Sequence, residues 1–526
     1  MSGIASRFLI VLGIVGFGWL SLEYASRLAL PRDRPESRVI DDTADTRLGR
    51  ALAAQVSANQ GRSGVWPIYE GRGAFADRAL LADAADVSLD VQYYIWRADM
   101  SGTLLSEALY RAAQRGVRVR LLLDDNGTRG ADSLLAALDS HPNIEVRLFN
   151  PFALRRFRVL GYLTDFGRLN RRMHNKSFTA DNQATIVGGR NVGDEYFGAG
   201  QAMRFIDLDV LAAGPVVKDV SADFDRYWAS ASAYPLASVL GEAARADPAA
   251  VSRRASIVER HPEAREYLAA VRDSGFLPAL LSGEISFEWT KVRLISDDPA
   301  KGLGQARTAE LLTHRLHDML GVAEKEVKLV TPYFVPTDAG VAALAAMTAR
   351  GVDVGVLTNS LEATDVVPVH AGYAKHRVAM LESGVKLYEL KRVATGDGPR
   401  DSHRMAGRSS SSLHAKVFSV DSKRLFVGSF NFDPRSMNLN TEMGLLIESP
   451  ALARAMADSM RDTLPGLAYE VSLAGDDTLR WIERRPGGDA ADASAEPIVH
   501  EHEPDAGFWS RVGVWITSRL PVEWLL

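Results

Sequence analysis

The pattern His-x-Lys-(x4)-Asp occurs twice in this chain of 526 residues, at His174 and again at His414. The two copies stand 240 residues apart, and the triplet Arg-Gly-Val recurs at the similar interval of 235 residues, at Arg115 and Arg350. An interval of this size is too long for a solenoid repeat and indicates that a whole domain has been duplicated.

The residues around the two triplets predict the same order of elements. Residues 87–96 are rich in β-branched and aromatic side chains and predict a buried strand, 104–114 predict a helix and 117–125 a second strand. The matching ranges of the second half are 327–336, 341–349 and 352–360. We therefore expect an α/β protein of two fused, duplicated domains, each with a central mixed β-sheet flanked by helices.

Composition changes along the chain suggest five segments. Residues 1–47 are expected to form a membrane anchor or signal segment with its linker, and 48–240 the first domain. Residues 241–295 read as a connector with little strand character, 296–470 as the second domain, and 471–526 as a C-terminal linker with an amphipathic tail.

The two ends of the chain are apolar. Residues 8–22 carry no charge; fifteen residues are short for a spanning helix and enough for a signal-peptide core. Weak cleavage signals favour a retained anchor, with a cleaved signal or a buried helix as alternatives. At the C-terminus, Trp515 and Arg519 lie at helical spacing, which suits either a membrane interface or a helix docked on the body.

Charge and cysteine content exclude several classes of function. The formal charge of −5, from 61 Lys and Arg against 66 Asp and Glu, gives no general attraction to nucleic acids, so no nucleic-acid partner is expected. Cysteine is absent, which excludes disulfides, thiolate catalysis and cysteine-based metal sites.

The two motifs supply the side chains that phosphodiester chemistry needs. Alternation around each copy predicts that its His and Lys point to one face of a strand. Two such strands meeting at a pseudo-twofold axis would form one shared site. Lys176, Lys416 and the carboxamides of Asn191 and Asn431 would neutralise phosphate oxygens. One neutral imidazole would attack phosphorus while the other, protonated, gives its proton to the leaving alkoxide.

Each imidazole also needs a partner that fixes its tautomer. Glu442 lies 28 residues after His414, and Asp207 lies 33 residues after His174. These two carboxylates are the candidate orienting groups, with Asp209 as the alternative to Asp207.

Other conspicuous residues have simpler interpretations. Tyr94 and Tyr333 occupy similar strand positions and are expected in the core, with a place in the substrate channel as the alternative. Residues 370–377 suit either the wall of a headgroup pocket or an ordinary surface helix. His314 and His317 are helix-spaced with no third ligand, so we expect a surface helix and no metal site.

The paired motifs resemble the phospholipase D superfamily, and nearly all of the chain after residue 60 resembles the bacterial cardiolipin synthases. The stretches that carry the resemblance are 89–96, 118–128, 171–197 and 412–444. Residues 357–377 and 520–526 are most similar to the cardiolipin synthase C subgroup.

The resemblance implies roles for the motif residues. It implies a covalent phosphohistidine intermediate and no metal or other cofactor, with His174 as the nucleophile and His414 as the acid and base. It assigns phosphate binding to the two lysines and two asparagines, and a hydroxyl contact to Ser429 that is missing at Gly189. Asp181 and Asp421, counted with the catalytic motifs, are expected to support the architecture around the site.

The resemblance also implies a function. We expect transfer of a phosphatidyl group from phosphatidylethanolamine or phosphatidylglycerol to phosphatidylglycerol, at the bacterial cytoplasmic membrane. A phospholipase D-type hydrolase and a nuclease or phosphodiesterase of the same superfamily are the alternatives. Sequence does not identify the side of the membrane, the oligomeric state or any protein partner.

Overall fold

The structure is a computed structural model that describes residue 17 and residues 34–198, 204–241, 246–392, 411–475, 478–484, 496–520 and 523. The apolar segment 8–22 lies outside the described residues, apart from Phe17. Within the ranges just given, no helix combines the length and apolar character needed to cross a membrane.

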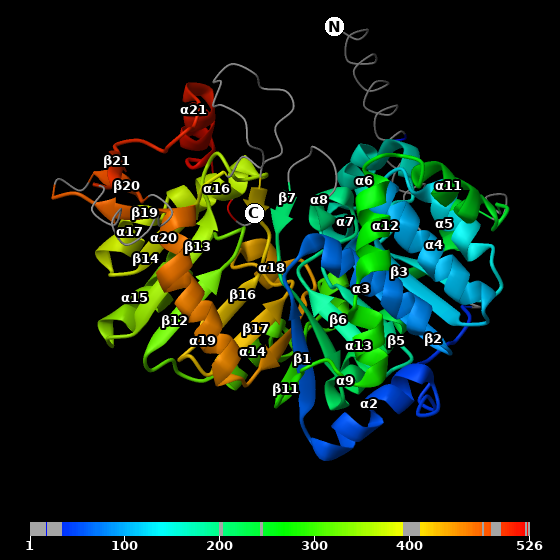
Figure 1. Cartoon of the computed structure of the whole chain (residues 1–526). Helices are drawn as coiled ribbons and strands as arrows, with labels where there is room; N and C mark the ends of the chain where they lie inside the picture. Colours follow the sequence, from blue (N-terminus) through cyan, green and yellow to red (C-terminus); the bar gives the residue numbers. More distant parts are fainter. Residues whose placement is uncertain are drawn as a thin grey trace, which may run out of the picture.

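The first half of the chain folds around a nine-stranded mixed sheet of order β10-β1-β8-β6-β5-β2-β3-β4-β9 (Figure 1). Strands β2, β3 and β4 are parallel, and the remaining pairs are antiparallel. The strands are β1 (Ser63–Ile68), β2 (Ser88–Ile95), β3 (Arg118–Gly127), β4 (Ile144–Phe149), β5 (Ser177–Ala180), β6 (Ala184–Gly188), β8 (Asp209–Ala213), β9 (Ala233–Pro235) and β10 (Glu288–Thr290). The main flanking helices are α2 (Arg47–Ala58), α3 (Gly71–Ala84), α4 (Met100–Gln114), α5 (Asp132–Asp139) and α9 (Pro215–Ala229).

The second half folds around a ten-stranded mixed sheet of order β11-β18-β17-β16-β12-β13-β14-β19-β20-β21. The strands are β11 (Val292–Ser296), β12 (Glu326–Val330), β13 (Asp353–Asn359), β14 (Lys386–Leu390), β16 (Val417–Val420), β17 (Arg424–Gly428), β18 (Met443–Ile447), β19 (Ala468–Leu473), β20 (Leu479–Glu483) and β21 (Ile498–His500). The helices include α14 (Leu312–Leu320), α15 (Thr337–Ala349), α16 (Val367–Ala374), α17 (Arg377–Glu382), α18 (Pro434–Asn438), α19 (Pro450–Asp458) and α21 (Phe508–Thr517).

The two sheets confirm the predicted duplication. The parallel trio β2, β3 and β4 corresponds to β12, β13 and β14, and in each half an antiparallel hairpin pairs with the first strand of the trio. These hairpins are β5–β6 and β16–β17. The predicted strand at 327–336 is shorter than expected, because β12 ends at Val330.

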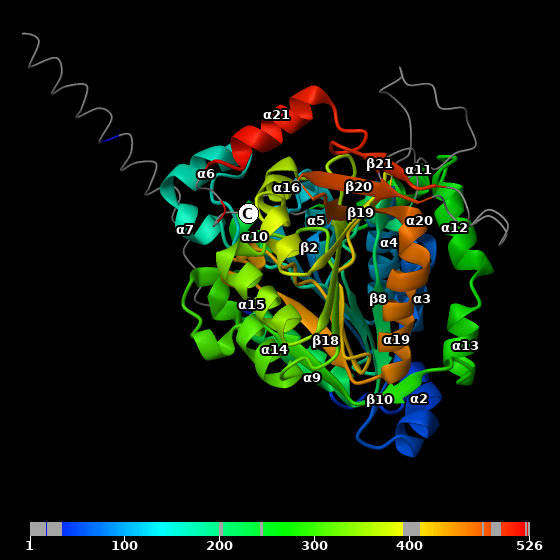
Figure 2. The same cartoon turned by 90° about the vertical axis from the view of Figure 1, so that its left-hand side faces the viewer.

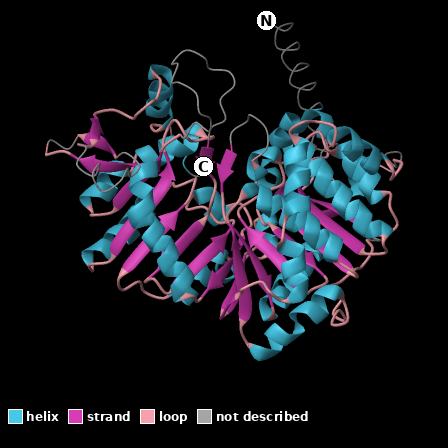
Figure 3. Ribbon diagram, viewed as in Figure 1, coloured by secondary structure: helices cyan, strands magenta, loops and turns pink. Residues whose placement is uncertain are grey.

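A shared apolar layer joins the halves. Val187 and Val210 from the first sheet pack in one buried cluster with Val417, Leu425 and Leu445 from the second. Burying apolar surface between two sheets stabilises their arrangement, so the boundary between the halves is a fixed interface. Figure 3 shows the strands of both halves converging on it.

The segment predicted as a connector is more ordered than its sequence suggested. Helices α11 (Ala250–Val258), α12 (Ala264–Asp273) and α13 (Phe276–Ser282) pack against the first half through α4, α3 and α2. Strand β10 then joins the first sheet and β11 the second, so Lys291 is the residue between the sheets. These short strands form by pairing with distant strands, which local sequence does not report.

Candidate active site

His174 and His414 lie at the boundary of the two halves, and each motif is held by the opposite half. The backbone N–H of His174 donates to the carbonyl of Thr441 (2.9 Å), and that of His414 to the carbonyl of Ile206 (2.8 Å). The two-stranded parallel sheet of β7 (Arg204–Ile206) and β15 (Ser411–Leu413) makes the second contact. The histidines were expected on strands, but β5 and β16 begin three residues after them.

The orienting carboxylates are exchanged between the halves. His174 Nδ1 hydrogen bonds to Glu442 Oε2 at 2.8 Å, and His414 Nδ1 to Asp207 Oδ2 at 2.6 Å. The pairing is therefore crossed. His174 binds Glu442, which follows His414 in the sequence, and His414 binds Asp207, which follows His174. The reason is the crossed backbone pairing, since Asp207 and Glu442 directly follow Ile206 and Thr441.

The alternative orienting residue, Asp209, has a different partner. Its buried carboxylate accepts hydrogen bonds from Arg78 (2.7 Å) and Arg190 (3.2 Å), both also buried. Arg190 in turn donates to the carbonyl of Asp207. Asp209 therefore neutralises two arginines beneath the site and does not contact either histidine.

Ser429, whose hydroxyl is predicted to contact substrate, is hydrogen-bonded within the protein, so the substrate contact stays a prediction. Its buried hydroxyl donates to Glu442 Oε2 and accepts from the backbone N–H of Met443. At the equivalent Gly189, an added Cβ would lie 2.2 Å from Asp207 Oδ1. In the second motif the Ser429 hydroxyl therefore supports the carboxylate of Glu442. In the first motif the carboxylate of Asp207 occupies the space that a side chain at position 189 would need.

Replacing Gly189 by Ser should therefore reduce activity, although Ser is native at the equivalent position. The new Cβ would push Asp207 away from His414, and disturbing a group that orients a reactive side chain typically costs about 10–100-fold. Steady-state turnover of a chromogenic phosphodiester measures the loss. Ser429→Gly is the matched control, because it removes the hydrogen bonds of one hydroxyl without a clash; an equal or larger loss in that control would contradict this account.

Burial and neighbouring charge make the two histidine pairs unequal. Burial, with the positive charges of Lys176 and Lys416, lowers the pKa of His174 well below its usual value. Burial also lowers the pKa of His414, to about 4, while Asp207 opposes this shift.

The two carboxylates shift in opposite directions. Burial tends to raise the pKa of Asp207, but His414 and Lys416 outweigh it and hold that pKa at about 2. Burial raises the pKa of Glu442 to about 7, against the effect of Lys176. Asp207 is therefore firmly ionised near neutral pH, and its charge stabilises the imidazolium form of His414 more strongly than Glu442 stabilises that of His174.

The motif lysines lie behind the histidines. Lys176 Nζ and Lys416 Nζ each donate to the carbonyl of the histidine two residues earlier, and both side chains are buried. Burial lowers the pKa of Lys416 to about 8. Neither lysine is among the described side chains lining the cavity, so direct phosphate contact stays a prediction.

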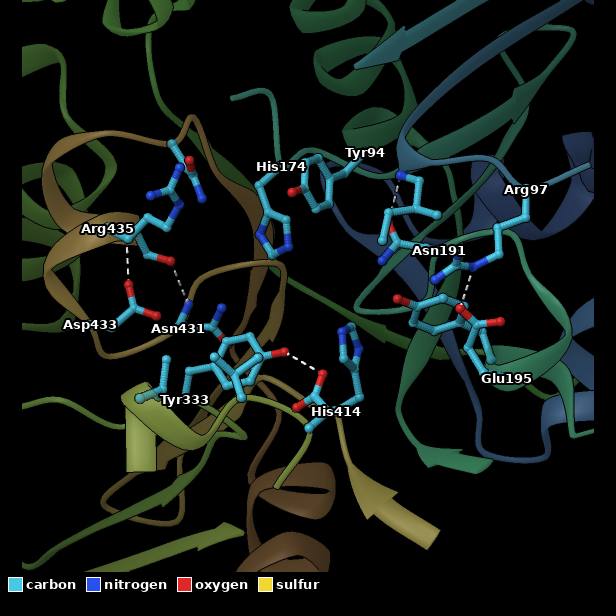
Figure 4. A pocket seen from close by; sticks show the side chains of 17 residues that line it. Tyr94, Arg97, His174, Asn191, Glu195, Tyr333, His414, Asn431, Asp433 and Arg435 are labelled. Carbon is cyan, nitrogen blue, oxygen red and sulfur yellow. Dashed lines mark hydrogen bonds and ion pairs between the residues drawn. The ribbon is translucent and has the colours of Figure 1, made fainter. Parts of the chain in front are cut away.

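Both histidines line one cavity of about 780 Å³ built from the two halves (Figure 4). The ring of Tyr94 packs edge-on against His174, with centroids 5.0 Å apart, and Tyr196 does the same to His414 at 5.1 Å. Tyr333 Oη donates to Asp365 at 2.7 Å. The core positions expected for Tyr94 and Tyr333 are therefore wrong; both rings form part of the cavity wall.

Asn191 and Asn431 line the same cavity. Asn191 Oδ1 accepts from the backbone N–H of Ile95 (3.2 Å), which directs the amide group. The buried Oδ1 of Asn431 has no hydrogen-bond partner within the described part of the chain. That oxygen can only accept, so a phosphate contact by Asn431 would use its amide N–H groups and stays a prediction.

Asp181 and Asp421 lie away from the cavity, at the turns of the two hairpins. Each accepts hydrogen bonds from three successive backbone N–H groups, at 86–88 for Asp181 and 324–326 for Asp421. These bonds fasten the hairpins to β2 and β12. Both residues were counted with the catalytic motifs, but their contacts are structural.

The remaining histidine candidates have local partners. His370 on α16 is buried and lies 3.0 Å from Glu503, while residue 369, just before the segment 370–377, lines the cavity. His314 on α14 pairs with Asp318 at 3.7 Å, as expected of a surface helix.

Sequence reasoning missed several cavity residues. Tyr196, Asp365 and the ion pair of Arg97 with Glu195 (2.5 Å) all line the cavity. Glu195 and Tyr196 lie about twenty residues after the first motif, in the short helix α8 (Asp194–Phe197) that follows β6. Their closeness to the motif in sequence is the local feature that could have indicated a place at the cavity. Asp365 belongs to the second half of the chain, and nothing in the sequence around it indicates a place at the cavity.

The chain matches the family described as "Cardiolipin synthase, PLD-like domain" over residues 79–228 and again over 316–463. It therefore belongs to this family and is a phosphatidyltransferase of the phospholipase D type. The two matched regions each contain one His-x-Lys-(x4)-Asp motif, which confirms the resemblance drawn from sequence.

Individual relatives agree with this assignment. The chain is 49% identical over 485 residues to cardiolipin synthase C of Escherichia coli (strain K12), covering 91% of this chain and 100% of that protein. It is 27% identical to cardiolipin synthase 2 of Bacillus anthracis, over 72% of this chain and 60% of that protein. The solved phosphatidylserine synthase of Haemophilus influenzae Rd KW20 shares the fold, with a TM-score of 0.50 and 15% identity over 81% of this chain and 92% of that one.

Proposed function

We propose that the chain synthesises cardiolipin by moving a phosphatidyl group from a donor phospholipid to phosphatidylglycerol, through phosphatidyl-His174. The observation that carries the proposal is the pairing of two histidines at one cavity with carboxylates of different ionisation. The family and the similarity to cardiolipin synthase C support the lipid substrates.

The first step forms the covalent intermediate. Neutral His174 attacks phosphorus through Nε2, because Nδ1 is held by Glu442. The bond from phosphorus to the headgroup oxygen breaks, and the imidazolium of His414 gives its proton to that oxygen. The ionised Asp207 favours the charged form of His414, and a bound phosphodiester anion favours it further.

The second step transfers the phosphatidyl group. His414, now neutral, takes the proton from a glycerol hydroxyl of phosphatidylglycerol, and that oxygen attacks phosphorus. The phosphorus–nitrogen bond breaks, His174 is restored, and cardiolipin leaves. Water in place of the glycerol hydroxyl would give phosphatidic acid, so exclusion of water from the cavity decides between synthase and hydrolase.

Product analysis tests this function. Purified protein is supplied with phosphatidylglycerol alone, and then with phosphatidylethanolamine carrying deuterated acyl chains. We expect cardiolipin in which one phosphatidyl group is deuterated when phosphatidylethanolamine is present. Phosphatidic acid as the main product would instead show a hydrolase, and cleavage of labelled DNA without lipid turnover would show a nuclease.

The cavity also supports phosphatidylethanolamine as a donor. Asp365, Tyr333 and Tyr196 line it together, and a carboxylate beside aromatic rings attracts an ammonium group. We expect Asp365→Asn to reduce use of phosphatidylethanolamine about tenfold, the effect of losing roughly 1.4 kcal/mol of binding. Transfer between two phosphatidylglycerol molecules should change less than threefold; an equal loss with both donors would contradict this donor site.

A further inference from the structure

Helix α6 (Arg158–Thr164) and α7 (Phe166–Leu169) present apolar side chains to solvent. Val159 is 76% exposed and Phe157 66%, and Leu160, Leu163 and Phe166 are exposed as well. Five large apolar groups exposed within ten residues form a continuous patch, which a protein surrounded only by water rarely carries.

Two arginines of this segment are directed toward the protein. Arg155 forms ion pairs with Asp125 and Asp132, and Arg158 donates to the backbone carbonyls of Asp125 and Asn126. A surface helix in water normally buries its apolar face and exposes its charges. The arrangement here is the reverse, so the outer face is built for an apolar environment.

Helix α21, on the other half, also presents apolar side chains to solvent. Val514 is buried against Leu361 and Ala371, so the helix is docked on the body, as one sequence interpretation expected. Yet Trp509 is 80% exposed and Trp515 58% exposed, and Ile516 is exposed too. The helix is therefore docked and also offers an apolar outer face, and the membrane-interface interpretation stays a prediction.

Cations accompany the tryptophans of α21. The guanidinium of Arg519 lies 3.9 Å from the centre of the Trp515 ring, and Arg511 is partly exposed on the same helix. Tryptophan and arginine together suit the boundary between water and lipid, where the ring is half-buried and the cation meets phosphate groups. Protein interfaces also use Trp and Arg, so the choice of a bilayer containing anionic lipid rests on the position of this face relative to the cavity and to α6–α7.

The two apolar faces lie at the same end of the molecule, one on each half (Figures 1 and 2). Each is linked to the cavity wall through packed residues. Helix α21 packs on α16, whose Val369 lines the cavity, and Arg158 of α6 binds Asn126, which hydrogen bonds Tyr94 of the cavity wall. Together they hold eight of the eighteen exposed large apolar side chains among the described residues.

We propose that α6–α7 and α21 form a two-part membrane-contact surface, which seats the cavity on a bilayer containing anionic phospholipid. The inference rests on the proposed function, since lipid substrates must enter the cavity from such a bilayer. Two patches at one end of the molecule, one on each half, suit contact with a broad surface such as a bilayer.

The absence of cysteine allows a direct test on the full chain. Val159→Cys and Ile516→Cys, each labelled with an environment-sensitive fluorophore, are mixed with vesicles of phosphatidylglycerol and phosphatidylethanolamine in a His174→Ala background that prevents turnover. Ala53→Cys and Val322→Cys are matched exposed controls, on α2 and before β12. We expect spin-labelled lipid to quench positions 159 and 516 at least threefold more than positions 53 and 322. Equal quenching at all four positions would overturn the proposal. Protection of positions 159 and 516 from aqueous iodide without quenching by spin-labelled lipid would show that something other than lipid covers this surface, and would overturn it too.

A second measurement separates this surface from the chemistry. Leu160→Ser combined with Leu163→Ser should lower turnover of lipid in vesicles about tenfold or more and leave turnover of a short-chain, water-soluble phospholipid unchanged. An equal loss on both substrates would mean that the helices only support the fold, and would overturn the proposal. If the native protein turns over neither lipid, the proposed function fails, while the fluorescence result still decides whether the surface meets a membrane.

Discussion

His414→Ala should slow transfer from natural phospholipids by about 10³-fold or more, because the leaving alkoxide then departs without a proton. The same variant should still release one equivalent of nitrophenol from a p-nitrophenyl phospholipid, since this leaving group needs no proton donor. Turnover should stop there, because the intermediate on His174 has no base to activate the acceptor. Stopped-flow absorbance measures the burst.

His174→Ala is the matched control for that experiment. It lacks the attacking nitrogen, so we expect neither a burst nor steady turnover with either substrate. The asymmetry follows from Asp207, whose pKa is held at about 2, against Glu442, whose pKa burial raises to about 7. A burst in His174→Ala that is absent from His414→Ala would reverse the assigned roles.

Substitutions of Asp207 and Asp209, which lie only two residues apart, should have different effects. Asp209→Asn should lower the free energy of unfolding by about 3 kcal/mol or more, because it leaves the buried Arg78 and Arg190 without their counter-ion. The midpoint of urea unfolding measures this loss.

Asp207→Asn should instead impair the reaction. Asp207 raises the pKa of His414, so removing its charge lowers that pKa and reduces the protonated fraction at any given pH. The basic limb of the kcat/KM profile should therefore move to lower pH, by about one unit for a loss of roughly 1.4 kcal/mol. A shift to higher pH, or a loss of stability equal to that of Asp209→Asn, would contradict the separate roles.

The duplicated fold could be predicted because both halves repeat local patterns. The strands around 87–96 and 117–125 and the helix between them are short-range features, and each is confirmed as β2, β3 and α4. Strands β10 and β11 were missed because they form by pairing with strands distant in sequence, where local propensity carries little information.

The residues of the site could be identified in part. Motif spacing located His174 and His414, and it selected Asp207 and Glu442 as their carboxylates. The crossed pairing was missed, because it depends on β7 joining β15 and on Met173 pairing with Thr441 across the interface. Such contacts between halves leave no periodic signal in either half.

The hydrogen bonds of Ser429 could not be predicted from the sequence for a similar reason. Its position in the motif indicated a hydroxyl near phosphate, and this substrate contact stays a prediction. The structure directs the hydroxyl to Glu442. The apolar outer face of α6–α7 was not predicted either, because it depends on the contacts of Arg155 and Arg158 with Asp125, which lies about thirty residues earlier in the sequence.

The central claim is that one cavity uses His174 as nucleophile and His414 as acid and base. Mass spectrometry of peptides from His414→Ala, quenched after reaction with the p-nitrophenyl phospholipid, tests it most directly. We predict a phosphatidyl group on the peptide that contains His174 and on no other. A phosphatidyl group on a different residue, or turnover with no covalent adduct at any time, would contradict the account.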